Sequence, residues 1–142
     1  MTEVEHKPIP RVEDCMSPDV VKFPASWMLD RAAQTMVERR IGSAVITDKD
    51  EVVGIITERD VLRAVARALV PWSTPVSDCM TAEPETVTPL TTAAEALSTM
   101  LAHGFRHLPV ISEEGLVGIV SLRDLARLSQ PAAPEDETIT TG

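Results

Sequence analysis

The sequence predicts an α/β (α+β) protein made of two copies of one β-α-β-β-α unit. Three observations lead to this prediction. The chain repeats itself at a fixed offset of 64 residues. Each copy places segments with the 3.6-residue apolar period of a helix between short apolar runs of strand length. The runs at the centre of each copy are almost continuously apolar, which is typical of strands covered on both faces.

The repeat is clearest where each copy begins and where its second half lies. Val12–Ser17 matches Val76–Thr81, and Val53–Asp60 matches Val117–Asp124. From residue 12 to residue 63, 13 of 52 positions are identical without a gap. A copy of about 60 residues is marginally stable alone, so we expect the copies to share a core and to pack as a pseudo-twofold pair. The expected division is an N-terminal arm (1–11), repeat 1 (12–70), a linker (71–75), repeat 2 (76–129) and a tail (130–142).

In the first copy, the elements follow from the pattern of apolar residues. A short strand is expected at Val20–Phe23, after a Ser-Pro turn. Two apolar strands, 41–47 and 52–56, flank a polar turn. A second helix is expected from Glu58 to about Leu69. The first helix is predicted by apolar residues at helical spacing: Leu29, Ala32, Ala33, Met36 and Val37.

The second copy repeats this order. A strand is expected near Val87, and the strands 105–111 and 116–120 precede a helix that begins at Leu122. Gly104 is placed to end the first helix of this copy, which carries Leu90, Ala94, Leu97 and Leu101. Prolines in 71–75 break helix and strand alike. Residues 130–142 lack periodicity, so we expect a disordered acidic tail.

Composition excludes several classes of function. The 142 residues carry a formal net charge of −9, which disfavours binding to a phosphate backbone. Aromatic residues are 3% of the chain, and tyrosine is absent, so stacking platforms for single strands are missing. No apolar run has transmembrane length, and the N-terminus lacks the apolar core of a signal peptide. We therefore expect a cytoplasmic protein that binds neither nucleic acid nor membrane.

Three elements that recur in both copies resemble the CBS domain, named after cystathionine β-synthase, whose tandem pair is also called a Bateman module. They are Asp-Cys-Met-Ser/Thr, a methionine-containing first helix, and Gly-Ile-(Ile/Val)-(Thr/Ser)-x-Arg-Asp. The stretch Phe105–Val110 is also similar to the family's central strand. The resemblance covers about residues 12–128. It implies a homodimeric regulatory or energy-sensing protein, not an enzyme, that binds AMP, ADP, ATP or an S-adenosylmethionine-like ligand between the repeats and signals by altered packing.

The sharpest candidate site is the pair Thr57 and Asp60, with its copy Ser121 and Asp124. A carboxylate can accept two hydrogen bonds from the vicinal hydroxyls of a ribose, and the N–H groups at a helix start favour a phosphate. Arg59 or Arg123, just before each aspartate, could supply a positive charge. The resemblance implies the same role, holding the ribose of an adenine nucleotide. The alternative is that both pairs are helix caps without a ligand.

Arg106 and His107 are a second candidate for phosphate recognition, because charge at the start of an apolar strand is costly unless it is paired or solvated. The first copy has Gly42 and Ser43 there. By resemblance the sites are crossed, and the more phosphorylated ligand is expected at the first of them. One site would join Thr57, Arg59 and Asp60 to Arg106 and His107, and the other would join Ser121, Arg123 and Asp124 to Ser43 and 18–21. Adenine would lie near Val20 and Val21, or near Pro84 and Val87.

Two other functions stay open. An interaction module would leave the sites unused and dock a partner enzyme or transporter. A metal or thiol sensor would use Cys15 and Cys79, but no further ligands stand at metal-binding spacing, so small buried thiols and no metal site are expected. No catalytic motif is visible. No covalent cofactor is expected, and a nucleotide could bind with or without Mg²⁺.

Overall fold

The computed structural model describes residues 8–129, which form two compact units. The first-copy unit is made of residues 18–85, and the second-copy unit is made of residues 8–17 and 86–129. Each unit thus contains most of one copy together with the segment that opens the other copy. We call these two segments, Val12–Ser17 and Val76–Thr81, the lead segments.

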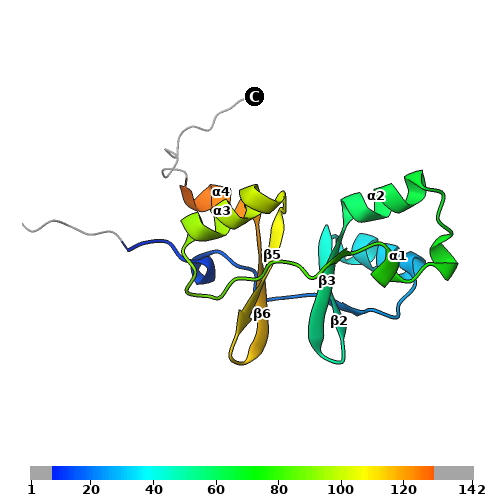
Figure 1. Ribbon diagram of the computed structural model, residues 1–142, viewed down its shortest axis with the longest axis horizontal. Helices are drawn as coiled ribbons and strands as arrows, with labels where there is room; N and C mark the ends of the chain where they lie inside the picture. The colour runs from blue at the N-terminus through cyan, green and yellow to red at the C-terminus, as the bar shows by residue number, and fades with distance from the viewer. Residues whose placement is uncertain (1–7, 130–142) are drawn as a thin grey trace, which may run out of the picture. The chain divides into compact units, whose positions relative to one another are not determined.

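The first-copy unit contains a four-stranded sheet with the order β1-β2-β3-β4. β1 is parallel to β2, whereas β3 is antiparallel to both of its neighbours, β2 and β4. Two helices complete the unit (Figure 1), with short 3₁₀ turns at Pro71–Ser73 and Val76–Asp78. The elements are β1 (Lys22–Pro24), α1 (Leu29–Arg39), β2 (Ser43–Asp48), β3 (Glu51–Thr57), α2 (Glu58–Ala66) and β4 (Thr81–Ala82).

The second-copy unit repeats the central part of this arrangement. β5 and β6 form an antiparallel hairpin, and single bridges stand where the other unit has its outer strands. Val87 pairs in parallel with Val110, and Ser17 of the lead segment pairs with Ile119. The elements are a 3₁₀ turn (Val12–Asp14), α3 (Ala93–His103), β5 (His107–Ser112), β6 (Gly115–Ser121) and α4 (Leu122–Ser129).

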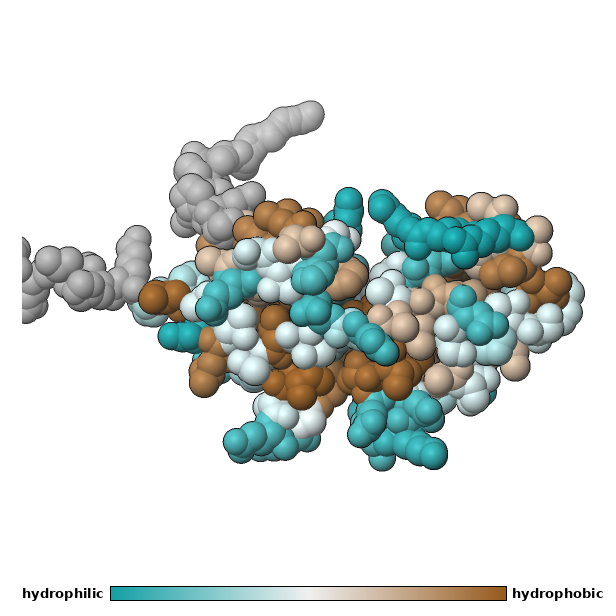
Figure 2. Space-filling model, in the orientation of Figure 1, coloured by the Kyte–Doolittle hydropathy of each residue, from teal (hydrophilic) through white to brown (hydrophobic). Residues whose placement is uncertain are grey.

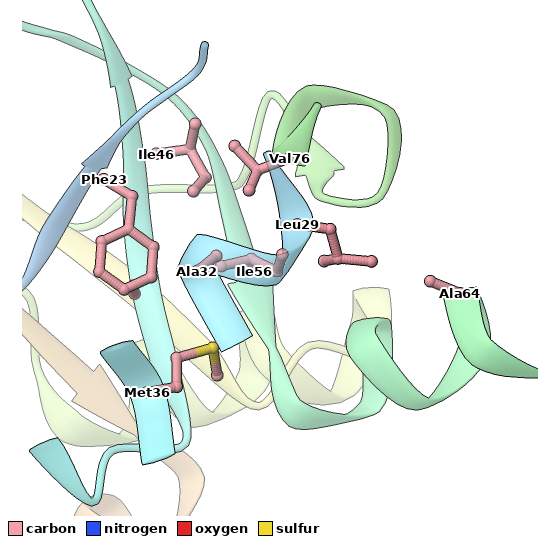
Figure 3. Close-up of a cluster of buried hydrophobic side chains, with 9 residues drawn as sticks. Phe23, Leu29, Ala32, Met36, Ile46, Ile56, Ala64 and Val76 are labelled. Atoms are coloured by element: carbon pink, nitrogen blue, oxygen red, sulfur yellow. The ribbon is translucent and has the colours of Figure 1, made fainter. Parts of the chain in front are cut away.

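Each unit has a hydrophobic core of its own, and a lead segment completes each core. Val76 belongs to the buried cluster of the first-copy unit and lies with Leu29 and Ile46 in Figure 3. Val12 belongs to the cluster of the second-copy unit, with Met100 and Leu108. Both valines are fully buried. The expectation that the copies share a core is thus met in part. Each of the two cores takes residues from both copies, because the copies exchange the segments that open them.

Most predicted elements are present, with shifted ends. β1 starts at Lys22, so Val20 and Val21 precede it. α2 ends at Ala66 instead of Leu69, because Ala68 has a left-handed φ of 60°. The strand expected near Val87 is a single bridge. The tail expected at 130–142 and most of the arm expected at 1–11 lie outside the described residues.

α3 differs most from its prediction. Thr92 begins it by accepting a hydrogen bond from the N–H of Glu95 (3.1 Å), so Leu90 lies before the helix and is exposed. Ala96 and Met100 face the core, whereas Leu101 is exposed. The C-terminal prediction is confirmed, since Gly104 ends α3 with a left-handed φ of 73°.

Candidate ligand site

In the first-copy unit, the predicted Thr57–Asp60 pair lies where β3 ends and α2 begins. The N–H of Thr57 donates to Asp60 Oδ2 (2.9 Å), and the N–H of Asp60 donates to Thr57 Oγ1 (3.3 Å). This reciprocal pair is a capping box, which satisfies backbone N–H groups that the helix itself cannot pair. The helix-cap interpretation of the motif is thus correct, and it leaves a ligand role open.

The Asp60 carboxylate is also held by two side chains. The Thr57 hydroxyl donates to Oδ2 (3.1 Å), and Arg63 Nη1 donates to Oδ1 (3.1 Å). The side chain is only 5% exposed, so these bonds compensate the cost of burying its charge. A ribose could still bond to the remaining lone pairs of the Asp60 carboxylate, but Arg63 already donates to Oδ1.

The equivalent pair in the second-copy unit is more open. The N–H of Ser121 donates to Asp124 Oδ2 (3.0 Å), and the N–H of Asp124 donates to Ser121 Oγ (3.0 Å). Arg127 Nη2 lies 3.8 Å from Asp124 Oδ1, beyond hydrogen-bond length. The Asp124 side chain is 21% exposed. Asp124 therefore offers an oxygen to a ligand more readily than Asp60 does.

Sequence reasoning missed Arg63 and Arg127, which are the basic residues that approach the two aspartates. The predicted residues Arg59 and Arg123 are exposed. Arg63 and Arg127 occupy equivalent positions three residues after each aspartate, among the identities between the two copies. One turn of helix places residues i and i+3 on the same face. That spacing was the signal that could have identified them.

The first residues of β2 and β5 lie beside the capping pairs of their own units. Ser43 pairs with Thr57 across β2 and β3, and His107 pairs with Ser121 across β5 and β6. The crossed sites expected from the family would instead join Asp60 to Arg106 and His107, which belong to the other unit. That grouping stays a prediction.

His107 is partly buried beside the second aspartate. Burial lowers its pKa below the ordinary value, the Asp124 carboxylate opposes this shift, and the Arg106 guanidinium adds to it. The imidazole is therefore mainly neutral near pH 7, and can donate one hydrogen bond and accept another. Arg106 itself is exposed, and its backbone carbonyl accepts a hydrogen bond from the N–H of Leu122 (2.8 Å).

The residues expected near adenine divide into two kinds. Val20, Val21 and Pro84 are partly buried, and Val21 accepts a backbone hydrogen bond from Val45 (2.9 Å). Val87 is buried in the core cluster of its unit. Val87 therefore supports the fold, whereas the first three keep surface that a ligand could contact.

The two cysteines are half-buried, so the expectation of buried thiols is only partly correct. Burial raises the pKa of the Cys15 thiol, and Asp124 and Asp14 raise it further. Burial likewise raises the pKa of Cys79, with Asp78 and Asp60 adding to the effect. Both thiols thus stay protonated, which makes them poor nucleophiles. Within residues 8–129, no three His, Cys, Asp or Glu side chains gather as a metal site.

A comparison with protein families matches the CBS domain model twice, at residues 12–67 and 76–130. The chain belongs to the CBS domain family. The two matches follow the sequence repeat, whereas the structural units exchange the lead segments.

Solved CBS structures share this fold. A CBS domain protein from Pyrobaculum aerophilum, solved in complex with AMP, is 29% identical, with a TM-score of 0.73 over 80% of this chain and 88% of that chain. The CBS domain pair of protein MJ0100, solved with 5′-methylthioadenosine and S-adenosyl-L-methionine, is 25% identical, with a TM-score of 0.77 over 85% and 96%. These two similar CBS proteins were thus solved with adenine compounds bound, a nucleotide in one and nucleosides in the other.

Curated relatives extend the comparison. An uncharacterised 17.7 kDa protein from Acidianus ambivalens is 48% identical over 98 residues, which cover 68% of this chain and 58% of that protein. An inosine-5′-monophosphate dehydrogenase from Korarchaeum cryptofilum is 35% identical over 92% of this chain, but over only 27% of the enzyme. The chain spans about half the length of the first curated relatives it matches.

Among the described residues, no helix is long and apolar enough to span a membrane.

Proposed function

We propose that this CBS-pair protein is a regulatory sensor that binds an adenine nucleotide or an S-adenosylmethionine-like ligand. The observation that carries the proposal is the duplicated corner in which Thr57–Asp60 and Ser121–Asp124 join a strand to a helix. Each corner presents a carboxylate to a ribose diol. The adenine ligands of the similar CBS structures support this choice of ligand.

Signalling by such a protein requires that the ligand favours one arrangement of the chain over another. A ligand can shift that equilibrium only by its difference in affinity for the two states. We propose that nucleotide binding changes how this CBS pair, or a homodimer of it, packs, and that the protein has no catalytic activity of its own.

The test is calorimetric titration of AMP, ADP, ATP and S-adenosylmethionine, with and without Mg²⁺. Asp60→Asn and Asp124→Asn are better variants than alanine, because the amide oxygen can still accept the capping bond from residue 57 or 121. Loss of charge-assisted bonds to a ribose should weaken binding about ten- to hundredfold in the variant that removes the site. Micromolar binding lost in one variant assigns the ribose site to that carboxylate.

Silence from all four ligands would leave both pairs as helix caps and favour an interaction module. That second function rests on apolar side chains that the helices leave at the surface, Val37, Leu62 and Leu101, and on the exposed Trp72. Figure 2 shows apolar surface over the helices. Such residues are common in protein interfaces. An interaction module should capture its partner enzyme or transporter equally well after Asp60→Ala and Asp124→Ala.

The same apolar helix surfaces support a homodimer as the assembly of this protein. Light scattering behind a sizing column measures its mass directly. A dimer that becomes a monomer on Leu62→Lys, with unchanged circular dichroism, would assign the contact to α2. A monomer at high concentration would exclude the homodimer.

A further inference from the structure

Two exposed arginines lie one turn apart on α4, and we call them the arginine face. They are Arg123 and Arg127, and the Arg127 side chain is 69% exposed. Residues four apart in a helix are neighbours on one surface, so their two positive charges repel each other. Within residues 8–129, Asp124 is the only acid that forms an ion pair with either arginine.

Asp124 compensates this charge only weakly. Its Oδ2 atom accepts a hydrogen bond from the N–H of Ser121 (3.0 Å). Its Oδ1 atom lies 3.8 Å from Arg127 Nη2, which is beyond hydrogen-bond length. α4 thus carries two arginines against one aspartate, and guanidinium N–H groups on its surface are left to donate to another anion.

The equivalent helix of the first copy, α2, lacks this arrangement. Arg63, the counterpart of Arg127, donates to Asp60 Oδ1 (3.1 Å) and is therefore paired. Residues 67–77, which follow α2, contain no Asp or Glu. The chain that follows α2 therefore offers no acidic group to this helix.

Three consecutive acids follow α4 instead. Glu135, Asp136 and Glu137 stand beyond the described residues, and we call them the acidic segment. Glu135 is six residues after Ser129, the last residue of α4, and six extended residues span about 20 Å. Arg123 stands six residues before Ser129, which is about 9 Å along a helix axis. The acidic segment can therefore reach either arginine.

We propose that the acidic segment docks on the arginine face of α4 in its own chain. Three carboxylates complement two guanidinium groups, and hydrogen bonds between such groups are strengthened by charge. Attachment through a few residues also gives the segment a high effective concentration at α4, which a free acidic peptide lacks. The arginine face is thus an interaction surface for acidic groups, and any other anion must displace the segment to bind there.

The docked segment has one consequence for ligand binding, which alone rests on the proposed function. Arg123 is predicted to lie in the crossed site with Ser121, Asp124 and Ser43. A segment held on Arg123 competes there with the phosphate of a nucleotide, but not with a ribose at Asp124. Loss of the charge of the segment should therefore strengthen AMP binding about two- to fivefold and leave adenosine binding unchanged.

The test compares the wild-type chain with Glu135→Gln/Asp136→Asn/Glu137→Gln, which keeps the chain length and removes the three charges. Nuclear magnetic resonance measures the backbone amides of α4 and the Nε–H groups of Arg123 and Arg127. These resonances should differ between the two proteins at low salt, and the difference should disappear at ~1 M NaCl, where the Debye length is about 3 Å. In an Arg123→Gln/Arg127→Gln background, neutralising the segment should shift α4 no further.

Glu113→Gln/Glu114→Gln is the matched control. It removes two exposed acids from the turn between β5 and β6 of the same unit, so it should leave the α4 resonances unchanged. α2 is the alternative place of docking, because Arg59 and Arg63 are also exposed. Its amides are recorded in the same spectra. Calorimetric titration of AMP and adenosine into both proteins tests the competition separately.

The outcomes separate the docking from the proposed function. Identical α4 resonances in the wild-type chain and the neutralised variant overturn the docking, and so do shifts in α2 instead of α4. Shifts that weaken on dilution assign the segment of a second copy, which overturns docking within one chain. Docking on α4 with unchanged AMP affinity overturns only the competition. Docking in a protein that binds neither AMP nor adenosine overturns the proposed function and supports the docking.

Discussion

Asp60 and Asp124 each cap a helix, and this structural role differs in strength between them. Asp60 is buried and accepts hydrogen bonds from the Thr57 backbone, the Thr57 hydroxyl and Arg63. Asp124 is more exposed, and its arginine lies at 3.8 Å. A ligand test that uses these residues must therefore separate loss of folding from loss of binding.

We predict that Asp60→Ala lowers the free energy of unfolding by about 2 kcal/mol, because it leaves the part-buried N–H of Thr57 and the half-exposed guanidinium of Arg63 without their acceptor. Asp124→Ala should cost about 1 kcal/mol, the usual loss of a helix cap. Urea unfolding followed by circular dichroism measures both values. Glu58→Ala, at an exposed neighbouring position, is the control and should change little. A larger cost at Asp124 than at Asp60 would contradict the burial argument.

The pKa of His107 gives a prediction about pH. Burial lowers the pKa of the folded imidazole below 6.5, its value in the unfolded chain. Below that value, the unfolded chain takes up the proton before the folded protein does. The free energy of unfolding should therefore fall as the pH decreases from 6.5 through the lowered pKa. His107→Gln should flatten this slope in urea titrations across the acid range. An unchanged slope would mean that another group controls acid stability.

At the scale of elements, helices and central strands were predictable wherever the apolar residues followed a single spacing, either that of a helix or that of a strand. α1 contains all the residues whose apolar spacing predicted it, from Leu29 to Val37, and α2 begins at the predicted residue, Glu58.

α3 was harder to predict, because only Leu97 of the three leucines used to predict it packs against the core, whereas Leu90 and Leu101 are exposed. Its start is set by the Thr92–Glu95 capping box instead of by Leu90. Capping chemistry is read from polar residues, which an apolar pattern ignores.

The glycine shared by both copies in the Val-Gly-Ile motif marks a close approach that the sequence pattern could not reveal. A Cβ on Gly54 would meet the Met80 side chain and stand 2.9 Å from the carbonyl oxygen of Thr81. A Cβ on Gly118 would stand 2.8 Å from Met16 Sδ and 2.9 Å from the carbonyl oxygen of Ser17. Each glycine thus leaves room for the lead segment that packs against its strand.

We predict that Gly54→Ala and Gly118→Ala each lower the free energy of unfolding by about 1–3 kcal/mol, because a backbone oxygen cannot move aside as easily as a side chain. Gly42→Ala is a matched control, since the added methyl group meets only the flexible end of Glu58. Its effect should stay within about 0.5 kcal/mol. Equal stability of all three variants would show that the lead segments can shift without cost.

At the scale of the whole molecule, the sequence repeat and the compact units divide the chain differently. The repeat boundary was visible from the identities at an offset of 64 residues. The exchange of lead segments was not, because Val12 and Val76 occupy equivalent positions and would suit either core. Tertiary pairing decides between them, through backbone bonds such as Val12 N–H to Thr91 (2.8 Å) and Val76 N–H to Trp27 (2.8 Å). Nothing in a local pattern carries that information.

Because the lead segments are exchanged, we predict that a mutation in the lead segment of one copy destabilises the unit named after the other copy. Val12→Ala removes buried methyl groups from the core around Met100 and Leu108, and Val76→Ala does so around Leu29 and Ile46. Each should cost about 2 kcal/mol. Hydrogen exchange followed by mass spectrometry should therefore show faster exchange in β5 and β6 for Val12→Ala, and in β2 and β3 for Val76→Ala. The reverse assignment, with Val12→Ala exposing β2 and β3, would mean that each lead segment packs with its own copy.

Both tryptophans, Trp27 and Trp72, lie in the first-copy unit, so their fluorescence offers an independent check. Their emission should respond directly to Val76→Ala, because this substitution alters the core that Trp27 packs against.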